Sequence, residues 1–106
     1  MDAAKEAVEF CVGQTQESME VDRMRALAVT RCFEIIGEAA ATVTPEFKAA
    51  YSSLPWRIMT GMRNRLVHAY FSIDLSIILE TARQDLPPLI TELEAVLAAE
   101  QEKGQR

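Results

Sequence analysis

The sequence predicts an all-α protein, an antiparallel helical bundle of four main helices plus one short connecting helix. Apolar residues recur every three or four positions along almost the whole chain, which is the spacing of amphipathic helices. Only 4 Gly and 4 Pro interrupt 106 residues, of which 49% are hydrophobic and 25% charged. Such a chain has room for one core. We expect a single domain over residues 1–100 and a polar, fraying tail over residues 101–106.

The first two helices are predicted from their apolar faces. One runs from Ala3 to about Thr15, and the next from about Asp22 to Val43, with Asp22 or Ser18 as its N-cap. The second helix is expected to bury one continuous stripe of Met24, Ala28, Cys32, Ile35, Ile36, Ala39 and Val43.

Capping residues and a helix-breaking stretch predict the short connector and the fourth helix. Thr44, Pro45 and Glu46 have the order N-cap, first helical position and early acid, which predicts a short helix to about Tyr51. After the Ser52–Pro55 break, apolar spacing predicts a helix from about Trp56 to Tyr70.

The last helix should begin at a cap supplied by Ser72 or Asp74. Pro87 and Pro88 lie inside it and should kink it, because both lack the amide donor that a helix needs. Its apolar stripe comprises Leu75, Ile78, Leu79, Ala82, Leu86, Leu89, Ile90, Leu93 and Leu97.

Composition excludes several classes of protein. No apolar run approaches the roughly 18–20 residues of a membrane span, and no secretory leader opens the chain. Cys11 and Cys32 form no C-x-x-C pair, and with one histidine they cannot complete a zinc site. Two cysteines in such a chain are typical of a reducing compartment. We therefore expect a cytoplasmic protein without a membrane partner, metal or other cofactor.

The net charge of −5 argues against general nucleic-acid binding, but the charge is unevenly placed. Between Phe47 and Ile73 there are four cations and no acid, whereas the remainder has 7 cations and 16 acids. This segment could hold phosphate locally, or its cations could cluster by chance on a solvated face. The four cations are Lys48, Arg57, Arg63 and Arg65.

The residues at four other positions have simpler explanations than a catalytic or metal-binding role. Glu34 and Glu38 share a helix face, but without a nearby histidine or third acid they fit solvated acids or partners of arginines better than a metal site. Gly37 and Gly61 lie inside predicted helices, where glycine costs about 1 kcal/mol relative to alanine. Close helix packing would explain both.

The strongest functional candidate is the run from Arg63 to Tyr70, which contains the only histidine, His68. On a continuous helix Arg63 and Tyr70 would share a face, whereas Arg63 and His68 would lie about 140° apart. Composition alone favours a helix-end histidine bonded to a carbonyl. A site would require the long arginine side chain, a local distortion or a second copy of the chain.

The string Arg63-x4-His68-x-Tyr70, in its surrounding sequence, resembles the signature of the HEPN superfamily, in particular of its HepT-like toxin group. The resemblance covers about residues 20–97, and only the character of the first helix matches. That helix begins close to Met1 and is shorter than the group leads us to expect, which suggests either a natural start upstream or a trimmed first helix. The matching stretches are Arg63-x4-His68-x-Tyr70 together with residues 34–39, 45–47, 55–56, 61–68 and 85–89.

The resemblance implies a dimeric, all-α ribonuclease that works without metal, paired with a nucleotidyltransferase antitoxin of the MNT type. By this resemblance Arg63 and His68 are the catalytic pair, and Asn64 and Arg65 support phosphate binding. Tyr70 is the residue that the antitoxin adenylylates. The implied protein is a type II/VII-like toxin that cleaves RNA by 2′-hydroxyl attack in a dimer cleft.

The residues themselves fit this chemistry. Attack of a 2′-hydroxyl on its phosphate needs a base, an acid and stabilisation of the charged phosphorane. Histidine can act as base or acid near neutrality, and arginine matches phosphate oxygens. One chain carries one histidine, so a homodimer would be needed to supply both roles.

A catalytically silent HEPN module that binds a nucleotidyltransferase is the alternative function. In such a module the motif would be kept for phosphate contacts or for folding. The intact Arg63, His68 and Tyr70 favour the enzyme.

Overall fold

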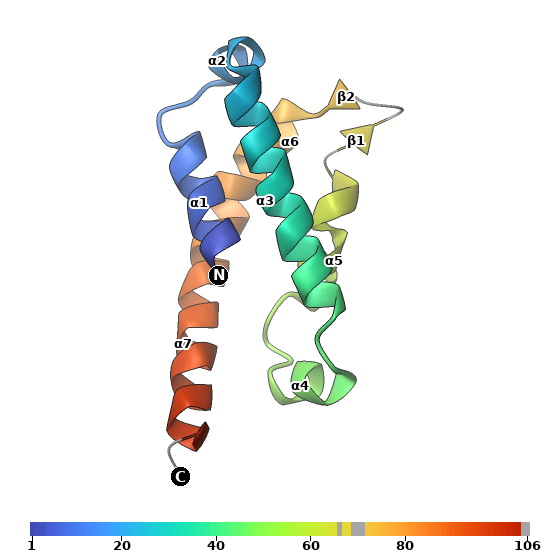
Figure 1. Cartoon of the computed structure of the whole chain (residues 1–106), viewed down its shortest axis with the longest axis vertical. Helices are drawn as coiled ribbons and strands as arrows, with labels where there is room; N and C mark the ends of the chain where they lie inside the picture. Colours follow the sequence, from blue (N-terminus) through green and yellow to red (C-terminus); the bar gives the residue numbers. More distant parts are fainter. Residues whose placement is uncertain (66, 69–71, 105–106) are drawn as a thin grey trace.

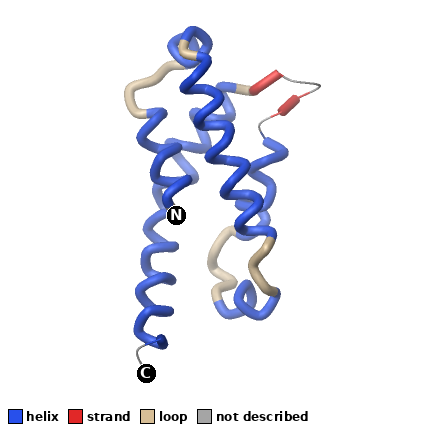
Figure 2. Tube along the Cα trace, viewed as in Figure 1, coloured by secondary structure: helices blue, strands red, loops and turns tan. Residues whose placement is uncertain are grey.

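A computed structural model describes residues 1–65, 67–68 and 72–104; for residues 63–65, 67–68 and 72–73 it describes the backbone alone. The chain forms an elongated helical bundle of about 50 × 27 × 19 Å (Figures 1 and 2). The all-α prediction is confirmed, and the strands among the described residues have two residues each. In chain order the elements are α1 (Asp2–Cys11), α2 (Gln16–Val21), α3 (Arg23–Ala41), α4 (Pro45–Ala50), α5 (Trp56–Arg65), β1 (Val67–His68), β2 (Ser72–Ile73), α6 (Leu75–Glu80), the π-helical segment η1 (Thr81–Asp85) and α7 (Leu86–Gly104).

The bundle is organised around α3, which makes its most extensive contacts with α5 and α1. Figure 1 shows α3 between α1 and α5, with α6 behind it. Phe33 and Val29 of α3 are fully buried, as are Met62 of α5 and Ile78 of α6. The core therefore joins the two halves of the chain through the inner face of one helix.

The face of α3 that is buried differs from the predicted stripe. Cys32 and Ile36 are buried as expected, but Met24 is 83% exposed and Ile35 is 40% exposed. Helix α3 carries apolar residues on more than one of its sides, so periodicity alone could not identify the face that packs against the core. The residues of α3 that are buried are Ala26, Val29, Cys32, Phe33, Ile36, Gly37 and Ala40.

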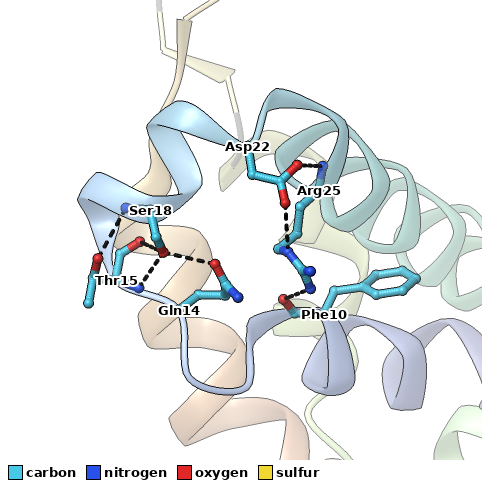
Figure 3. Close-up of polar contacts among 6 residues, drawn as sticks. All are labelled: Phe10, Gln14, Thr15, Ser18, Asp22 and Arg25. Carbon is cyan, nitrogen blue, oxygen red and sulfur yellow. Dashed lines mark hydrogen bonds and ion pairs between the residues drawn. The ribbon is translucent and has the colours of Figure 1, made fainter.

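The first helix ends earlier than predicted, at Cys11 rather than near Thr15. Gly13 follows with a φ of 71°, a backbone conformation that glycine adopts without strain. Thr15 and Ser18 then form a reciprocal capping box that begins α2, a helix the sequence analysis missed. The Thr15 amide donates to Ser18 Oγ at 2.8 Å, and the Ser18 amide donates to Thr15 Oγ1 at 3.1 Å (Figure 3).

Asp22 caps α3, as one of the two predicted choices. Its Oδ1 accepts the backbone N–H of Arg25 and its Oδ2 accepts the Arg25 Nε–H, both at 3.1 Å. Arg25 Nη1 also donates to the Phe10 carbonyl oxygen at 2.9 Å, which ties the end of α1 to the start of α3 (Figure 3). The pKa of the Asp22 carboxyl is lowered, first by the backbone hydrogen bond from Arg25 and then by its side chain.

The connector and the last helix begin where predicted. Thr44 Oγ1 accepts the Phe47 amide N–H at 3.2 Å, and Pro45 occupies the first turn of α4. Asp74 Oδ1 caps α6 by accepting the amide N–H groups of Ser76 and Ile77 at 3.1 and 3.2 Å.

The distortion predicted in the last helix lies at η1, immediately before the prolines. α6 and α7 are visibly inclined to each other in Figure 1, with the π-helical turn of η1 between them. Pro87 and Pro88 lack amide donors, so the helix must rearrange its hydrogen bonds just upstream of them. α7 continues through Gly104 and includes the first residues of the polar tail.

Gly61 does not serve close packing, contrary to the sequence-based interpretation. A Cβ placed on it would meet no atom of the described chain within 4 Å, and its φ is not positive. Gly61→Ala should therefore raise the free energy of unfolding by about 0.5–1 kcal/mol, because alanine loses less conformational entropy in a helix. Thermal and urea denaturation measure the change. Gly13→Ala is the matched control and should destabilise the protein, since its positive φ strains any side chain.

The Asp22 cap should make stability depend on pH. Its folded pKa is depressed, so its contribution is present above the unfolded pKa and is lost as pH falls through the folded pKa. Asp22→Asn should thus be less stable than the wild type at pH 7, and the difference should vanish below the pKa of the wild-type carboxyl. Chemical denaturation across pH 2.5–7 measures it. An unchanged difference at low pH would contradict the assignment.

Candidate functional site at the end of α5

The candidate residues lie where α5 gives way to a short hairpin. Arg63, Asn64 and Arg65 form the last turn of α5, and His68 is the second residue of β1. β1 pairs antiparallel with β2, placing His68 opposite Ser72 and Val67 opposite Ile73. The catalytic pair suggested by the sequence is therefore divided between a helix end and an adjoining strand.

The predicted helix from Trp56 to Tyr70 is wrong in its last turn, because α5 ends at Arg65. The angular argument that placed Arg63 and Tyr70 on one helix face, and His68 about 140° away, therefore does not apply. Tyr70 lies outside the described residues, and so does any contact it makes. The sequence left three ways to bring Arg63 and His68 together, one of which was a local distortion of the helix. The structure shows such a distortion, a change from helix at Arg63 to strand at His68.

A local signal for this change was present in the sequence. The residues after Arg65 are rich in β-branched and aromatic types, which favour extended backbone. Three residues separate His68 from Ser72, a length common in hairpins. The apolar spacing of the preceding helix obscured this pattern. The residues of this kind are Val67, Tyr70, Phe71 and Ile73.

Both ends of the segment are fixed to the core. Met59 and Met62 of α5 are 6% and 0% exposed, so the rotation of α5 about its axis is set by packing against α3. On the other side, Asp74 starts α6 directly after β2, and Ile78 and Leu79 bury the next turn. The last turn of α5 and the start of α6, which border this segment, are thus both positioned by the core.

The beginning of α5 is held by aromatic contacts. Trp56 Nε1–H donates to the Tyr51 carbonyl oxygen at 3.0 Å. The Trp56 ring meets Phe47 edge to face, with centroids 6.4 Å apart, and the Lys48 ammonium lies 5.9 Å from its centroid. Trp56 is half-buried, so it anchors the start of α5 and orients the helix that carries Arg63.

Elsewhere the described residues offer no comparable site. They contain no group of three or more His, Cys, Asp or Glu side chains that could hold a metal ion. Glu34 pairs with Arg31 at 3.1 Å, which fits its interpretation as a partner for an arginine. An apolar groove of about 250 Å³ lies between α7 and the facing ends of α1, α3 and α5, and its lining of aliphatic and aromatic side chains supplies no acid or base.

Two further observations describe the rest of the chain. Cys11 and Cys32 are free and buried, and burial raises the pKa of each thiol. In the described part of the chain, every helix is too short or too polar to cross a bilayer.

An all-α bundle in which Arg63 lies in the last turn of α5 and His68 lies on the adjoining strand β1 has the Arg-x4-His arrangement of the HEPN class. Residues 1–96 match the sequence model of the family described as "Ribonuclease HepT-like". The chain therefore belongs to the HepT-like ribonuclease family.

Relatives with assigned names are consistent with this membership. A protein of Thermococcus cleftensis named "Probable ribonuclease HepT" is 40% identical over 73 residues, 69% of this chain and 66% of that protein. Proteins of Methanocaldococcus jannaschii and Caldanaerobacter subterraneus, both named "Putative RNase", are 32% and 34% identical. These alignments cover 91% and 88% of this chain, and 88% and 83% of the relatives. No solved structure matches the chain.

Proposed function

We propose that this protein is a metal-independent endoribonuclease and the toxin of a type II/VII-like toxin–antitoxin pair. One observation carries the proposal: Arg63 and His68 stand at the α5–β1 junction, in a segment without acids, within a HepT-like chain. The names of the relatives support ribonuclease activity. The expected setting is the cytoplasm, where RNA and a nucleotidyltransferase antitoxin would both be available.

The proposed reaction is attack of an RNA 2′-hydroxyl on the adjacent phosphorus. A base removes the 2′-proton, the 5′-oxygen leaves with a proton from an acid, and the products carry a 2′,3′-cyclic phosphate and a 5′-hydroxyl. His68 supplies the base or the acid, and the Arg63 guanidinium stabilises the additional charge on the phosphorane. Asn64 and Arg65, on the same last turn, would hold neighbouring phosphates.

A homodimer completes this mechanism. Each chain provides one histidine, whereas the reaction uses a base and an acid, so two copies would supply one each. The backbone geometry is compatible with sharing, because the end of α5 and the strands β1 and β2 lie to one side of α3 in Figure 1.

His68→Ala and Arg63→Ala should each lower the rate of RNA cleavage by about 10²-fold or more, because each removes an acid–base or electrostatic contribution to the transition state. Purified, unmodified protein is incubated with total RNA in EDTA, and the rates and end groups of the products are measured. Arg57→Ala is the matched control, since Arg57 is an exposed cation on the same helix, and its effect should stay below about ten-fold.

Two results would contradict the proposed mechanism. Cleavage that EDTA abolishes would exclude the metal-independent reaction. Failure to cut any RNA, together with retained binding of a nucleotidyltransferase, would establish the catalytically silent module in place of the enzyme.

Adenylylation of Tyr70 should switch the enzyme off. The transfer joins the tyrosine oxygen to the α-phosphorus of ATP and releases pyrophosphate, which leaves at least one negative charge two residues from His68. That charge would pair with Arg63 or Arg65 and occupy the place of an RNA phosphate. After co-expression with the antitoxin, intact mass should rise by one or more AMP units, and peptide mapping should locate the first on Tyr70.

Tyr70→Phe should stay unmodified and toxic, whereas Tyr51→Phe is the matched control and should be modified and neutralised like the wild type. Tyr51 lies at the end of α4, where its hydroxyl hydrogen-bonds Glu100 of α7. A neutralised wild-type chain without AMP on Tyr70 would show that the antitoxin acts by binding alone.

A further inference from the structure

The outward face of α3 carries apolar side chains that the bundle does not cover. Met24 is 83% exposed, Leu27 46% and Ile35 40%. With Arg31, these residues follow at intervals of three and four, so they form one stripe along the helix. Single exposed apolar residues are ordinary, but a stripe on one long helix marks an interaction surface. In Figure 1, α3 lies on the near side of the bundle with no other element in front of it.

Charges on α3 are divided between its two halves. Arg23, Arg25 and Arg31 lie in the first part of the helix, and Glu34 and Glu38 lie in the second. Among the described residues, Arg25 and Arg31 have ion-pair partners on α3 or its cap, whereas neither Arg23 nor Glu38 has one. An antiparallel copy of the same helix would place each basic half against an acidic half.

We propose that the α3 stripe, defined as Met24, Leu27, Arg31 and Ile35, is the surface on which a second copy of this chain docks. The two α3 helices cross antiparallel about a two-fold axis near their midpoints, with Met24 of one copy facing Ile35 of the other. Such an isologous contact is self-complementary in shape and in charge. Two exposed apolar stripes are buried at once.

This dimer would complete the active site of the proposed ribonuclease, so its role in catalysis rests on the proposed function. The C-terminal end of α5 lies level with the middle of α3 in Figure 1. A two-fold axis through that level brings both copies of the Arg63–His68 segment to the same region of the dimer. The second histidine that RNA cleavage requires would then come from the copy docked on the α3 stripe.

Met24→Glu tests the surface, because it sets a third acid against the acidic half of the second copy. Sedimentation equilibrium should show a wild-type dimer at micromolar concentration and a dissociation constant raised at least about 30-fold by the substitution. Val12→Glu is the matched control, since Val12 is 69% exposed outside α3, and it should leave the dimer intact. Leu97→Glu, in the apolar groove and 50% exposed, should also leave it intact.

Exchange of charges tests the antiparallel direction. Arg23→Glu and Glu38→Arg should each weaken the dimer, and the double variant should restore it, because residue 23 of one copy meets residue 38 of the other. Within one chain the two positions are about 22 Å apart along the helix and cannot pair. Restoration therefore reports a contact between copies.

The outcomes decide the proposal independently of catalysis. A monomeric wild type, a dimer lost in Leu97→Glu but kept in Met24→Glu, or an unrestored double variant would each overturn it. RNA cleavage is measured on the same samples. A dimer that follows these rules but cuts no RNA would retain the docking surface and reject the enzyme, whereas full activity in a monomeric variant would reject the shared site.

Discussion

Burial of the inner face of α3 is the constraint on which the rest of the structure depends. Phe33 and Val29 are fully enclosed, and α1 and α5 pack against this helix from either side. Loss of a buried side chain of that size costs about 3–5 kcal/mol for phenylalanine, a large part of the stability of a small domain. Because α1 and α5 have α3 as their common neighbour, a shift of α3 would displace both. At the start of α3, the hydrogen bonds among Asp22, Arg25 and Phe10 also fix α1 relative to α3.

The packing of α5 against α3 determines the position of the candidate site. Buried Met59 and Met62 determine how α5 is rotated against α3, and so where its last turn emerges. The chain re-enters the bundle at Asp74, which caps α6. Between these anchors the backbone forms a short antiparallel pair, and the placement of His68 relative to α5 follows from that pairing rather than from helix geometry. The core thus determines the positions of the backbone segments that carry the candidate residues Arg63 and His68.

The sequence predicted those features that local chemistry determines. Asp22, Thr44 and Asp74 cap helices as expected, because a cap depends on three or four neighbouring residues. Two features required tertiary information. The buried face of α3 could not be selected while apolar residues lay on several sides, and Gly61 has open space that a sequence cannot reveal. The end of α5 was missed for a third reason, since apolar spacing outweighed the β-favouring residues around Val67.

The uneven charge of the chain also acquires a structural explanation. A net charge of −5 repels RNA at long range, yet in physiological salt charges are screened over about 8 Å. An RNA phosphate bound beside the last turn of α5 would therefore respond mainly to nearby charges, and that turn contributes Arg63 and Arg65. In the proposed enzyme the acidic remainder would discourage binding to other faces of the molecule, so the charge pattern would favour RNA binding at one place. An adenylyl group two residues from His68 would lower the positive charge at that place by at least one unit, and so weaken its attraction for an RNA phosphate.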